Sequence, residues 1–230
     1  MSIATTFMVD TVRTNAHLIP ADVPYIGGYV SGLGSVPWTN AEWNRFSGRK
    51  IRNYQGAGLY PGVSGYDELD VEFQALTPDS ATAEVKKRVD AGIQWTTLYG
   101  SRDYILATTD KIKALGNNYW NGHVNVRLAD WSLNLAQATA LIGTGIGGAT
   151  IVGVQWASDS SNPNTVIPGT SLSLSAVGAD LSVVNANWIP SGGFEPPVPA
   201  PVPVPSPGPT VPTIRQVTVD YTDGSQKVLV

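Results

Sequence analysis

Four acidic residues of this 230-residue chain stand where apolar, strand-like segments end or begin. Asp10 follows Thr5–Val9, Asp70 and Glu72 lie in the run Leu-Asp-Val-Glu-Phe, and Asp180 opens the last apolar segment. An acid within an apolar run costs on the order of a few kcal/mol to bury unless it is paired or functional. Because the chain has only 18 acidic residues, this placement predicts a site of general acid–base chemistry.

Asp70 and Glu72 carry the strongest signal. Residues i and i+2 of a strand face the same side, with Cα atoms roughly 7 Å apart, so both carboxylates are expected to face one cavity while Val71 faces a helix layer. Glycosidic cleavage uses two carboxyl groups roughly 5–9 Å apart. One carboxyl group is kept protonated by burial and by its charged neighbour, and it donates to the leaving oxygen while the other stays ionised.

Two other interpretations of these acids remain open. The pair can be a charged strand end at a solvated barrel mouth, or Asp10, Asp70 and Glu72 can bind Mg²⁺ or Ca²⁺, because hard cations prefer carboxylate oxygens. We predict that the site consists of carboxylates alone and contains no metal and no cofactor.

Aromatic residues favour a sugar as the ligand. The chain has 7 Trp and 9 Tyr, and Tyr99, Trp131 and Trp156 stand at predicted strand ends, where ring faces are able to stack on pyranose faces. Asp130 precedes Trp131 at the same strand end, and we predict that these four residues bind substrate. The alternative for each ring is ordinary core packing. His17 and His123 lack metal-ligand spacing and are expected to be structural or at the surface.

These residues are carried by alternating strand-like and helix-like segments. The predicted strands are Thr5–Val9, Tyr25–Val30, Lys50–Tyr54, Glu68–Phe73, Gln94–Tyr99, Val124–Ala129, Ile151–Trp156 and one near Asp180–Val184. The predicted helices begin at the capping box Thr39–Glu42, at Thr77-Pro78, at Arg102 and at Leu133. Eight strands alternating with helices predict an α/β fold, a flattened, TIM-like (β/α)-barrel with some helices missing. An open doubly wound sheet is the alternative.

Composition excludes several classes of function. The net charge is −4 and the pI is near 5.0, and no basic stripe is present, so we expect no nucleic-acid partner. The absence of Cys removes disulfides and thiol chemistry. Neither a signal peptide nor an apolar run of transmembrane length is visible, so we expect no membrane partner. Gly143–Gly148 matches G-x-G-x-x-G, but it follows a predicted helix, so we interpret it as a turn.

The composition changes after about residue 190. Nine of the seventeen residues 196–212 are Pro, which is typical of a polyproline II spacer. Beyond it, Arg215–Tyr221 and Ser225–Val230 flank Thr222-Asp-Gly224, a strong hairpin signal. We therefore predict a barrel over residues 1–190, a Pro-rich linker over 191–212 and a β-hairpin docking segment over 213–230.

The ordered set of motifs resembles glycoside hydrolase family 25, the muramidases of phages and bacteria, over about residues 3–189. The matching pieces are Met8-Val-Asp10, Leu69-Asp-Val-Glu72, Leu98-Tyr-Gly100, Leu128-Ala-Asp-Trp131, Val154-Gln-Trp156 and Asp180-Leu-Ser-Val-Val184. The resemblance implies a flattened barrel of five β/α units followed by strands, and cleavage of the β-1,4 bond after N-acetylmuramic acid in peptidoglycan. It implies that Glu72 is the general acid, that Asp70 assists the substrate's N-acetyl group, and that Asp10 and Asp180 support them.

This resemblance and the tail together predict a bacteriophage virion component, in the tail or the capsid. Its barrel is expected to bind peptidoglycan or another cell-surface glycan, and its hairpin is expected to dock onto other virion proteins by strand addition. Whether the barrel hydrolyses the glycan is left open here. The alternatives are a free phage endolysin, held in the host cytoplasm before release, and an inactive barrel that is architectural or binds glycan.

Overall fold

The computed structural model describes residues 3–32, 36–59, 65–189, 217–220 and 226–229. The chain divides into two compact units, Met1–Phe194 and Glu195–Val230, and each is described by itself. The predicted linker and the predicted hairpin turn lie outside the described residues. In the second unit, β10 (Val217–Asp220) and β11 (Gln226–Leu229) pair antiparallel, with Val217 opposite Leu229.

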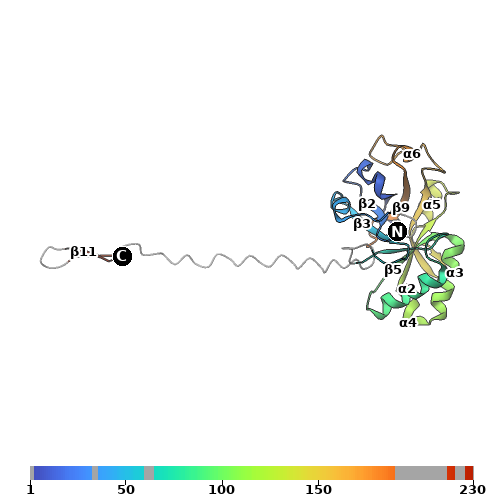
Figure 1. The fold of residues 1–230 in the computed structure, drawn as a ribbon, viewed down its shortest axis with the longest axis horizontal. Coiled ribbons are helices and arrows are strands. Elements are labelled where there is room, and N and C mark those ends of the chain that lie inside the picture. The colour runs from blue at the N-terminus through green and yellow to red at the C-terminus, as the bar shows by residue number, and fades with distance from the viewer. Residues whose placement is uncertain (1–2, 33–35, 60–64, 190–216, 221–225, 230) are drawn as a thin grey trace. The chain divides into compact units, whose positions relative to one another are not determined.

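The first unit is a closed eight-stranded β-barrel of mixed α/β type (Figure 1). Its strands are β1 (Thr5–Thr11), β2 (Tyr25–Tyr29), β3 (Arg49–Tyr54), β4 (Glu68–Asp70), β5 (Thr96–Ser101), β6 (Val124–Ala129), β8 (Ala149–Ala157) and β9 (Ala179–Asn185). Neighbours from β1 to β6 pair parallel, and β6 pairs parallel with β8. β9 closes the ring antiparallel to both β8 and β1. The amino end of β9 therefore lies at the same end of the barrel as the carboxyl ends of the other strands.

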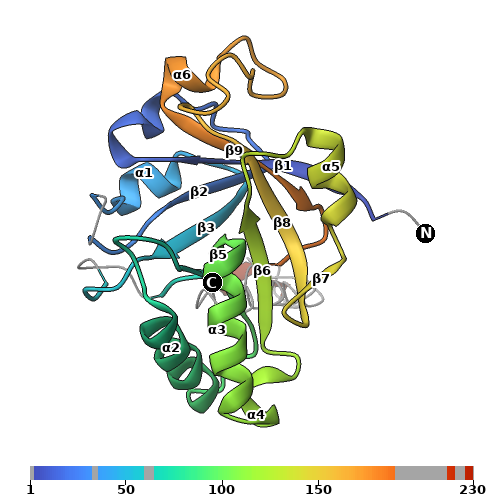
Figure 2. The ribbon, with the colours of Figure 1, turned by 90° about the vertical axis from the view of Figure 1, so that its right-hand side faces the viewer.

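Helices cover the barrel unevenly. The helical segments are η1 (Arg13–Leu18), α1 (Asn40–Asn44), α2 (Pro78–Asp90), α3 (Arg102–Ala114), α4 (Asn117–Trp120), α5 (Leu135–Leu141) and α6 (Leu174–Val177). The two long helices, α2 and α3, pack against each other, and α3 lies along β5 and β6 (Figure 2). The connections from β1 to β2 and from β2 to β3 carry only short helices. None of the helices within the described ranges has the length and the apolar character needed to cross a bilayer.

Local sequence explains where the helices begin. The Thr39 side chain accepts a hydrogen bond from the Glu42 backbone, and the Glu42 side chain accepts one from the Thr39 backbone, so the predicted capping box is confirmed. Thr77 caps α2, with Pro78 at its first position. The G-x-G-x-x-G segment does follow a helix, α5, and it leads into β8 through the two-residue strand β7 (Gly145–Ile146). Gly147 and Gly148 turn that hairpin with φ values of 55° and 85°.

Two apolar clusters stabilise the barrel. The larger cluster lies between the outward strand faces and the helices, and it includes Val9, Ile26 and Leu98. A smaller cluster contains Met8, Tyr25, Ile51, Val152, Val184 and Trp188. Because Met8 and Asp10 are two residues apart on β1, they face the same side of the strand. The barrel interior is thus apolar toward one end and acidic toward the other.

All eight predicted strands are present, but one prediction of extent is wrong. The strand predicted over Glu68–Phe73 ends at Asp70. A turn begins there: the Ala75 backbone N–H donates to the Glu72 carbonyl, the Leu76 N–H donates to the Asp70 carbonyl, and Gln74 adopts a φ of 68°. Alternation alone did not reveal this turn, because its residues continue the polar–apolar pattern of the strand.

Candidate functional site

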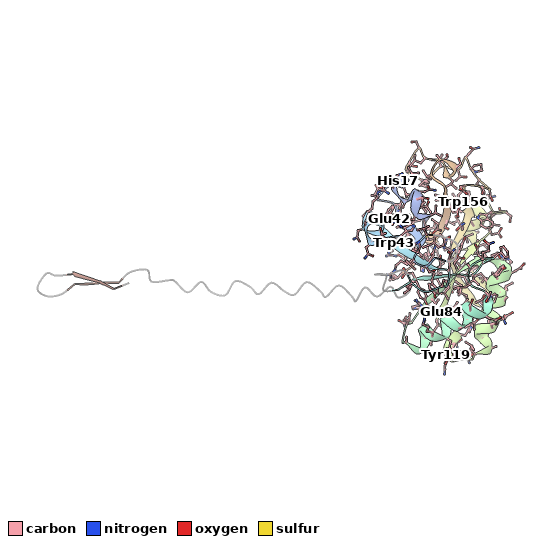
Figure 3. The ribbon with its side chains drawn as sticks, viewed as in Figure 1. His17, Glu42, Trp43, Glu84, Tyr119 and Trp156 are labelled. Carbon is pink, nitrogen blue, oxygen red and sulfur yellow. The ribbon has the colours of Figure 1, made fainter. Side chains whose placement is uncertain are left out.

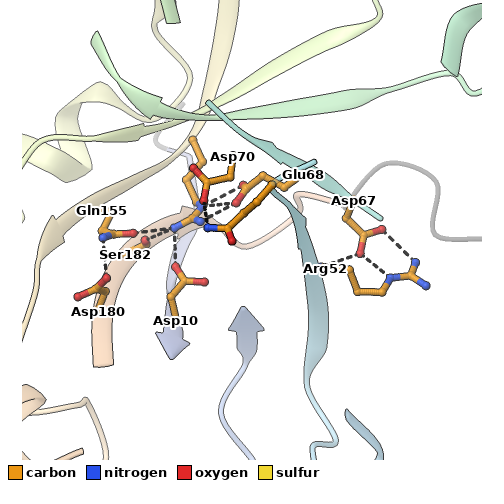
Figure 4. Close-up of polar contacts among 10 residues, drawn as sticks. Asp10, Arg52, Asp67, Glu68, Asp70, Gln155, Asp180 and Ser182 are labelled. Carbon is orange, nitrogen blue, oxygen red and sulfur yellow. Dashed lines mark hydrogen bonds and ion pairs between the residues drawn. The ribbon is translucent and has the colours of Figure 1, made fainter. Parts of the chain in front are cut away.

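Arg127 on β6 is the centre of a polar network inside the barrel. Figure 4 labels its partners Asp10, Glu68, Gln155 and Ser182. Its Nη2 donates to Glu68 Oε1 at 2.6 Å and its Nε donates to Glu68 Oε2 at 2.9 Å, so the two side chains form a bidentate pair. Its Nη1 donates to Asp10 Oδ2 at 2.5 Å. The same Nη1 also contacts Gln155 Oε1 at 3.0 Å and Ser182 Oγ at 3.1 Å. One buried cation is therefore shared by two carboxylates from different strands.

Asp180 joins this network from β9. It lies directly opposite Asp10 in the antiparallel register of β1 and β9, and its Oδ2 accepts a hydrogen bond from Gln155 Nε2 at 3.0 Å. Gln155 thus links Asp180 to Arg127. The predicted convergence of Asp10 and Asp180 is a direct consequence of the antiparallel closing strand.

Asp70 approaches the same centre from β4. It is 2 % exposed, and its Oδ2 accepts from Gln55 Nε2 at 2.9 Å. Its Oδ1 is buried and accepts no hydrogen bond from the described residues. Leaving a buried carboxylate oxygen without a donor is costly, so this atom marks a strained point of the network.

Glu72 lies in the turn after β4, not on the strand as predicted. It still faces the acidic group: after burial, the charge of Asp70 is the next largest cause that raises its pKa, and Asp180 and Glu68 also contribute. Val71 is fully buried in the outer core. The i, i+2 pair on the strand itself is Glu68 and Asp70, both of which face inward.

Burial shifts the pKa values of this group upward. It raises the pKa of Glu72 to about 7 and that of Asp70 to about 6. It also raises the pKa of Glu68 to about 7, against the opposing effect of Arg127, and that of Asp180 to about 7, with Asp10 as a further cause. Because burial disfavours charge and several carboxyl groups share one guanidinium, some of these acids hold a proton near neutral pH.

Asp10 and Arg127 respond differently to the same burial. The pKa of Asp10 is raised by burial, and Arg127 opposes that shift. Burial alone would lower the pKa of Arg127, but Asp10 and Glu68 together raise it well above its usual value. Arg127 therefore stays charged and opposes the rise in the pKa of both partners, although burial still outweighs it at Asp10 and Glu68.

A cavity of about 220 Å³ opens at this end of the barrel. It is lined by Asp10, Gly27, Tyr29, Asn53, Asp159 and Asp180, among others. Burial and then the charges of Asp70 and Asp10 raise the pKa of Tyr29 well above its usual value, so this ring is close to both acids. The cavity therefore gives a ligand access to Asp10 and Asp180 from the side of β1, β2 and β9, whereas Asp70 and Glu72 are not among its lining residues.

The residues predicted to bind substrate are placed differently from one another. Tyr99 is buried, with the Arg127 guanidinium 3.9 Å from its ring centroid. Trp156 is partly buried and packs against the outer core (Figure 3). Trp131 is 42 % exposed beside the barrel end. Asp130 Oδ1 accepts hydrogen bonds from the Ser132 backbone and hydroxyl. Of the three aromatic residues, Trp131 presents the most accessible ring.

Several residues of the site were not among the predicted ones, and Glu68, Arg127 and Gly27 are the most informative of them. Glu68 was identifiable from the same-face rule, because it stands two residues before Asp70. Arg127 was identifiable as a charge within the buried segment Val124–Ala129. Gly27 was not recognisable from sequence: a Cβ at this position would lie 1.5 Å from Asp10 Oδ1, so the carboxylate occupies the space that a side chain would need.

The described ranges contain no group of three or more His, Asp or Glu side chains arranged to hold a metal ion, so Asp10, Asp70 and Glu72 form no such group. His17 is exposed on η1 (Figure 3), and His123 Nδ1 lies 2.7 Å from the Gln94 carbonyl oxygen. The arrangement is suited to proton transfer by carboxyl groups next to an ionised carboxylate.

Comparisons with known protein families, with characterised proteins and with solved structures find no match to this chain.

Proposed function

We propose that residues 1–190 form a flattened, TIM-like barrel similar to glycoside hydrolase family 25, which binds peptidoglycan or another cell-surface glycan and hydrolyses its β-1,4 bonds. The observation that carries this proposal is the group of acids, from several different elements, that meets at one end of the barrel with pKa values raised toward neutrality. A carboxyl pair with separated roles is what glycosidic cleavage requires.

In this proposal Glu72 is the general acid. Its pKa of about 7 keeps a large fraction protonated at neutral pH, and its side chain is more exposed than those of Glu68 and Asp70 on β4. Asp70, with a pKa of about 6, is ionised under the same conditions and takes the role of assisting the N-acetyl group of the substrate. Asp10 and Asp180 support the charge balance.

Arg127 fixes this charge balance. Its guanidinium pairs with Glu68 and Asp10 and favours negative charge on both. Charge on Glu68 raises the pKa of Glu72, and charge on Asp10 raises that of Asp180. Arg127 is thus a positioning residue, since it acts through other carboxyl groups.

Zymography on purified peptidoglycan tests the proposal. The wild-type chain is expected to clear the gel, and Glu72→Gln is expected to lower the rate about 10²–10⁴-fold. Glu84→Gln is the matched control, because Glu84 lies on α2 and accepts a hydrogen bond from the Tyr66 hydroxyl. No clearing by a folded wild-type chain would reject hydrolysis of this glycan.

A second candidate function is glycan binding without hydrolysis. It is favoured by the ion pairs of Arg127, which engage Asp10 and Glu68 as a structural network would. Sedimentation with insoluble peptidoglycan separates the two functions: binding by the wild type with no release of reducing sugar supports the second.

We further propose that the protein is a bacteriophage virion component, in the tail or capsid, and that the pair β10–β11 docks onto other virion proteins. The support is the Pro-rich sequence between the barrel and an antiparallel strand pair, since an isolated two-stranded pair is marginal in water. Mass spectrometry of purified particles is expected to detect the chain. Its presence only in the lysate would instead support a free endolysin.

A further inference from the structure

A second cavity, of about 230 Å³, lies at the other end of the barrel. It is lined by Trp95, which precedes β5, Trp120 at the end of α4, and residues at the amino ends of β6 and β8. The acidic group lies at the carboxyl ends of the same parallel strands, so the two cavities are separated by the length of the barrel.

The lining of this cavity combines two indole rings with neutral hydrogen-bonding groups. Asn121, Asn125 and Thr150 supply the amides and a hydroxyl, and none of the lining residues in the described part of the chain is charged, although the Lys113 ammonium lies beside them on the Trp120 ring. Trp95 is a large apolar side chain, and it is 38 % exposed at the surface. Flat apolar rings beside amide donors and acceptors match the two kinds of surface on a sugar, whose ring C–H face is apolar and whose hydroxyl edge is polar.

Two glycines leave space beside these rings, and a lysine lies over one of them. The Lys113 ammonium lies 5.0 Å from the Trp120 ring centroid, and a Cβ at Gly148 would come within 3.2 Å of the Trp120 ring. Gly122 has a φ of 72°, and a Cβ there would reach 3.9 Å from the Trp95 ring. Glycines therefore leave the ring surfaces uncovered where other residues would begin to fill the cavity.

We infer that the Trp95–Trp120 cavity is a binding site for a neutral N-acetylated saccharide, distinct from the acidic group. Indole faces stack on the sugar ring, and the two Asn side chains bond its acetamido and hydroxyl groups. The site holds a polymeric glycan at a second point, which raises the overall affinity through effective concentration. This inference does not depend on hydrolysis at the acidic group.

Titration of the full chain with N-acetylglucosamine tetramer, followed by the indole N–H signals in NMR, tests the site. The signals are assigned with Trp95→Phe and Trp120→Phe. The Trp95 and Trp120 signals are expected to shift together, and Trp95→Ala is expected to weaken this binding about tenfold or more. Leu135→Ala is the matched control: it removes a large apolar side chain, 50 % exposed at the start of α5 and not among the lining residues, and is expected to leave the Trp95 shift unchanged.

A second variant keeps the test decisive if Trp95→Ala does not fold. Thr150→Arg fills the cavity from an exposed position on β8 and is expected to abolish the shifts with both tryptophans in place. The inference is overturned if the tetramer moves neither signal at millimolar concentration. It is equally overturned if a synthetic peptide of residues 196–212, rather than the saccharide, moves them, because the cavity is then a polyproline site.

Discussion

At the scale of single residues, the proton on Glu72 decides the proposed chemistry. The general acid must be protonated and Asp70 must be ionised, and their pKa values are about 7 and about 6. Hydrolysis is therefore expected to rise as pH increases through about 6 and to fall as it increases above about 7. The pH dependence of reducing-sugar release checks this, and a rate that stays flat from pH 5 to 9 would contradict the assigned roles.

Arg127 is the residue on which the buried charge depends most. Its side chain is 1 % exposed and pairs with two carboxylates, so Arg127→Met leaves Asp10 and Glu68 buried without a cation. We expect a loss of about 3–5 kcal/mol in the free energy of unfolding at pH 7.5, measured in urea.

The loss in Arg127→Met is expected to shrink at pH 5, because the folded variant then protonates both acids, whose pKa values burial alone raises. Arg102→Met, at an exposed position on α3, is the control and is expected to change stability by less than about 0.5 kcal/mol. Equal losses at both pH values would show that Arg127 acts through packing rather than through charge.

Acidic residues at strand ends were recognisable from sequence because charge in an apolar run is costly and therefore conspicuous. Asp10, Asp70, Glu72 and Asp180 were found in this way. The ion pairs that organise them were not, because Arg127 and Glu68 are 59 residues apart in the chain and only barrel closure brings them together. The partner of a buried charge is a property of the fold, not of the local pattern.

At the scale of elements, the two consecutive glycines of β2 are explained by side chains of neighbouring elements that lie close to the strand. Gly27 faces inward beneath Asp10, and a Cβ at Gly28 would meet the Trp38 ring at 2.4 Å on the outer side. Consecutive glycines are therefore explained by two close contacts on opposite faces of one strand, since successive residues alternate in direction.

Gly27→Ala is expected to displace the Asp10 carboxylate and to destabilise the barrel by about 1–3 kcal/mol. The Asp10–Arg127 pair must move to admit the new methyl group, so proposed hydrolysis is expected to fall as well. Gly145→Ala is the control, because its nearest atom to a Cβ is the Ala149 carbonyl oxygen at 3.7 Å. Urea unfolding and zymography check both variants, and equal behaviour of the two would refute the role of Gly27.

The strands and the capped helices could be predicted because their signals are local. Periodic apolar residues marked all eight barrel strands, and side-chain caps marked α1 and α2. The short elements η1, α4, β7 and α6 were missed, because segments of two to six residues are too short to show a hydrophobic period. The early end of β4 was missed for a related reason, since backbone bonds of the turn at Asp70 and Glu72 define it.

At the scale of the whole molecule, the barrel is closed at its apolar end by residues that directly precede the tail. Trp188 is 4 % exposed and stacks on Tyr25, with ring centroids 5.8 Å apart and planes 4° from parallel. The Tyr25 hydroxyl donates to the Trp188 carbonyl at 2.7 Å, and Arg49 donates both to that carbonyl and to the Tyr25 hydroxyl. The end of the barrel chain is thereby fixed to β2 and β3.

A chain shortened to residues 1–190 is therefore expected to keep the urea midpoint of the full chain, whereas one shortened to residues 1–187 is expected to lose stability. Removing Trp188 exposes the inner apolar cluster of Met8, Ile51 and Val184 and leaves Tyr25 without its stacking partner. Trp188→Ala isolates the side chain and is expected to cost about 3–5 kcal/mol. Equal urea midpoints for residues 1–187 and 1–190 would show that Trp188 does not stabilise the barrel.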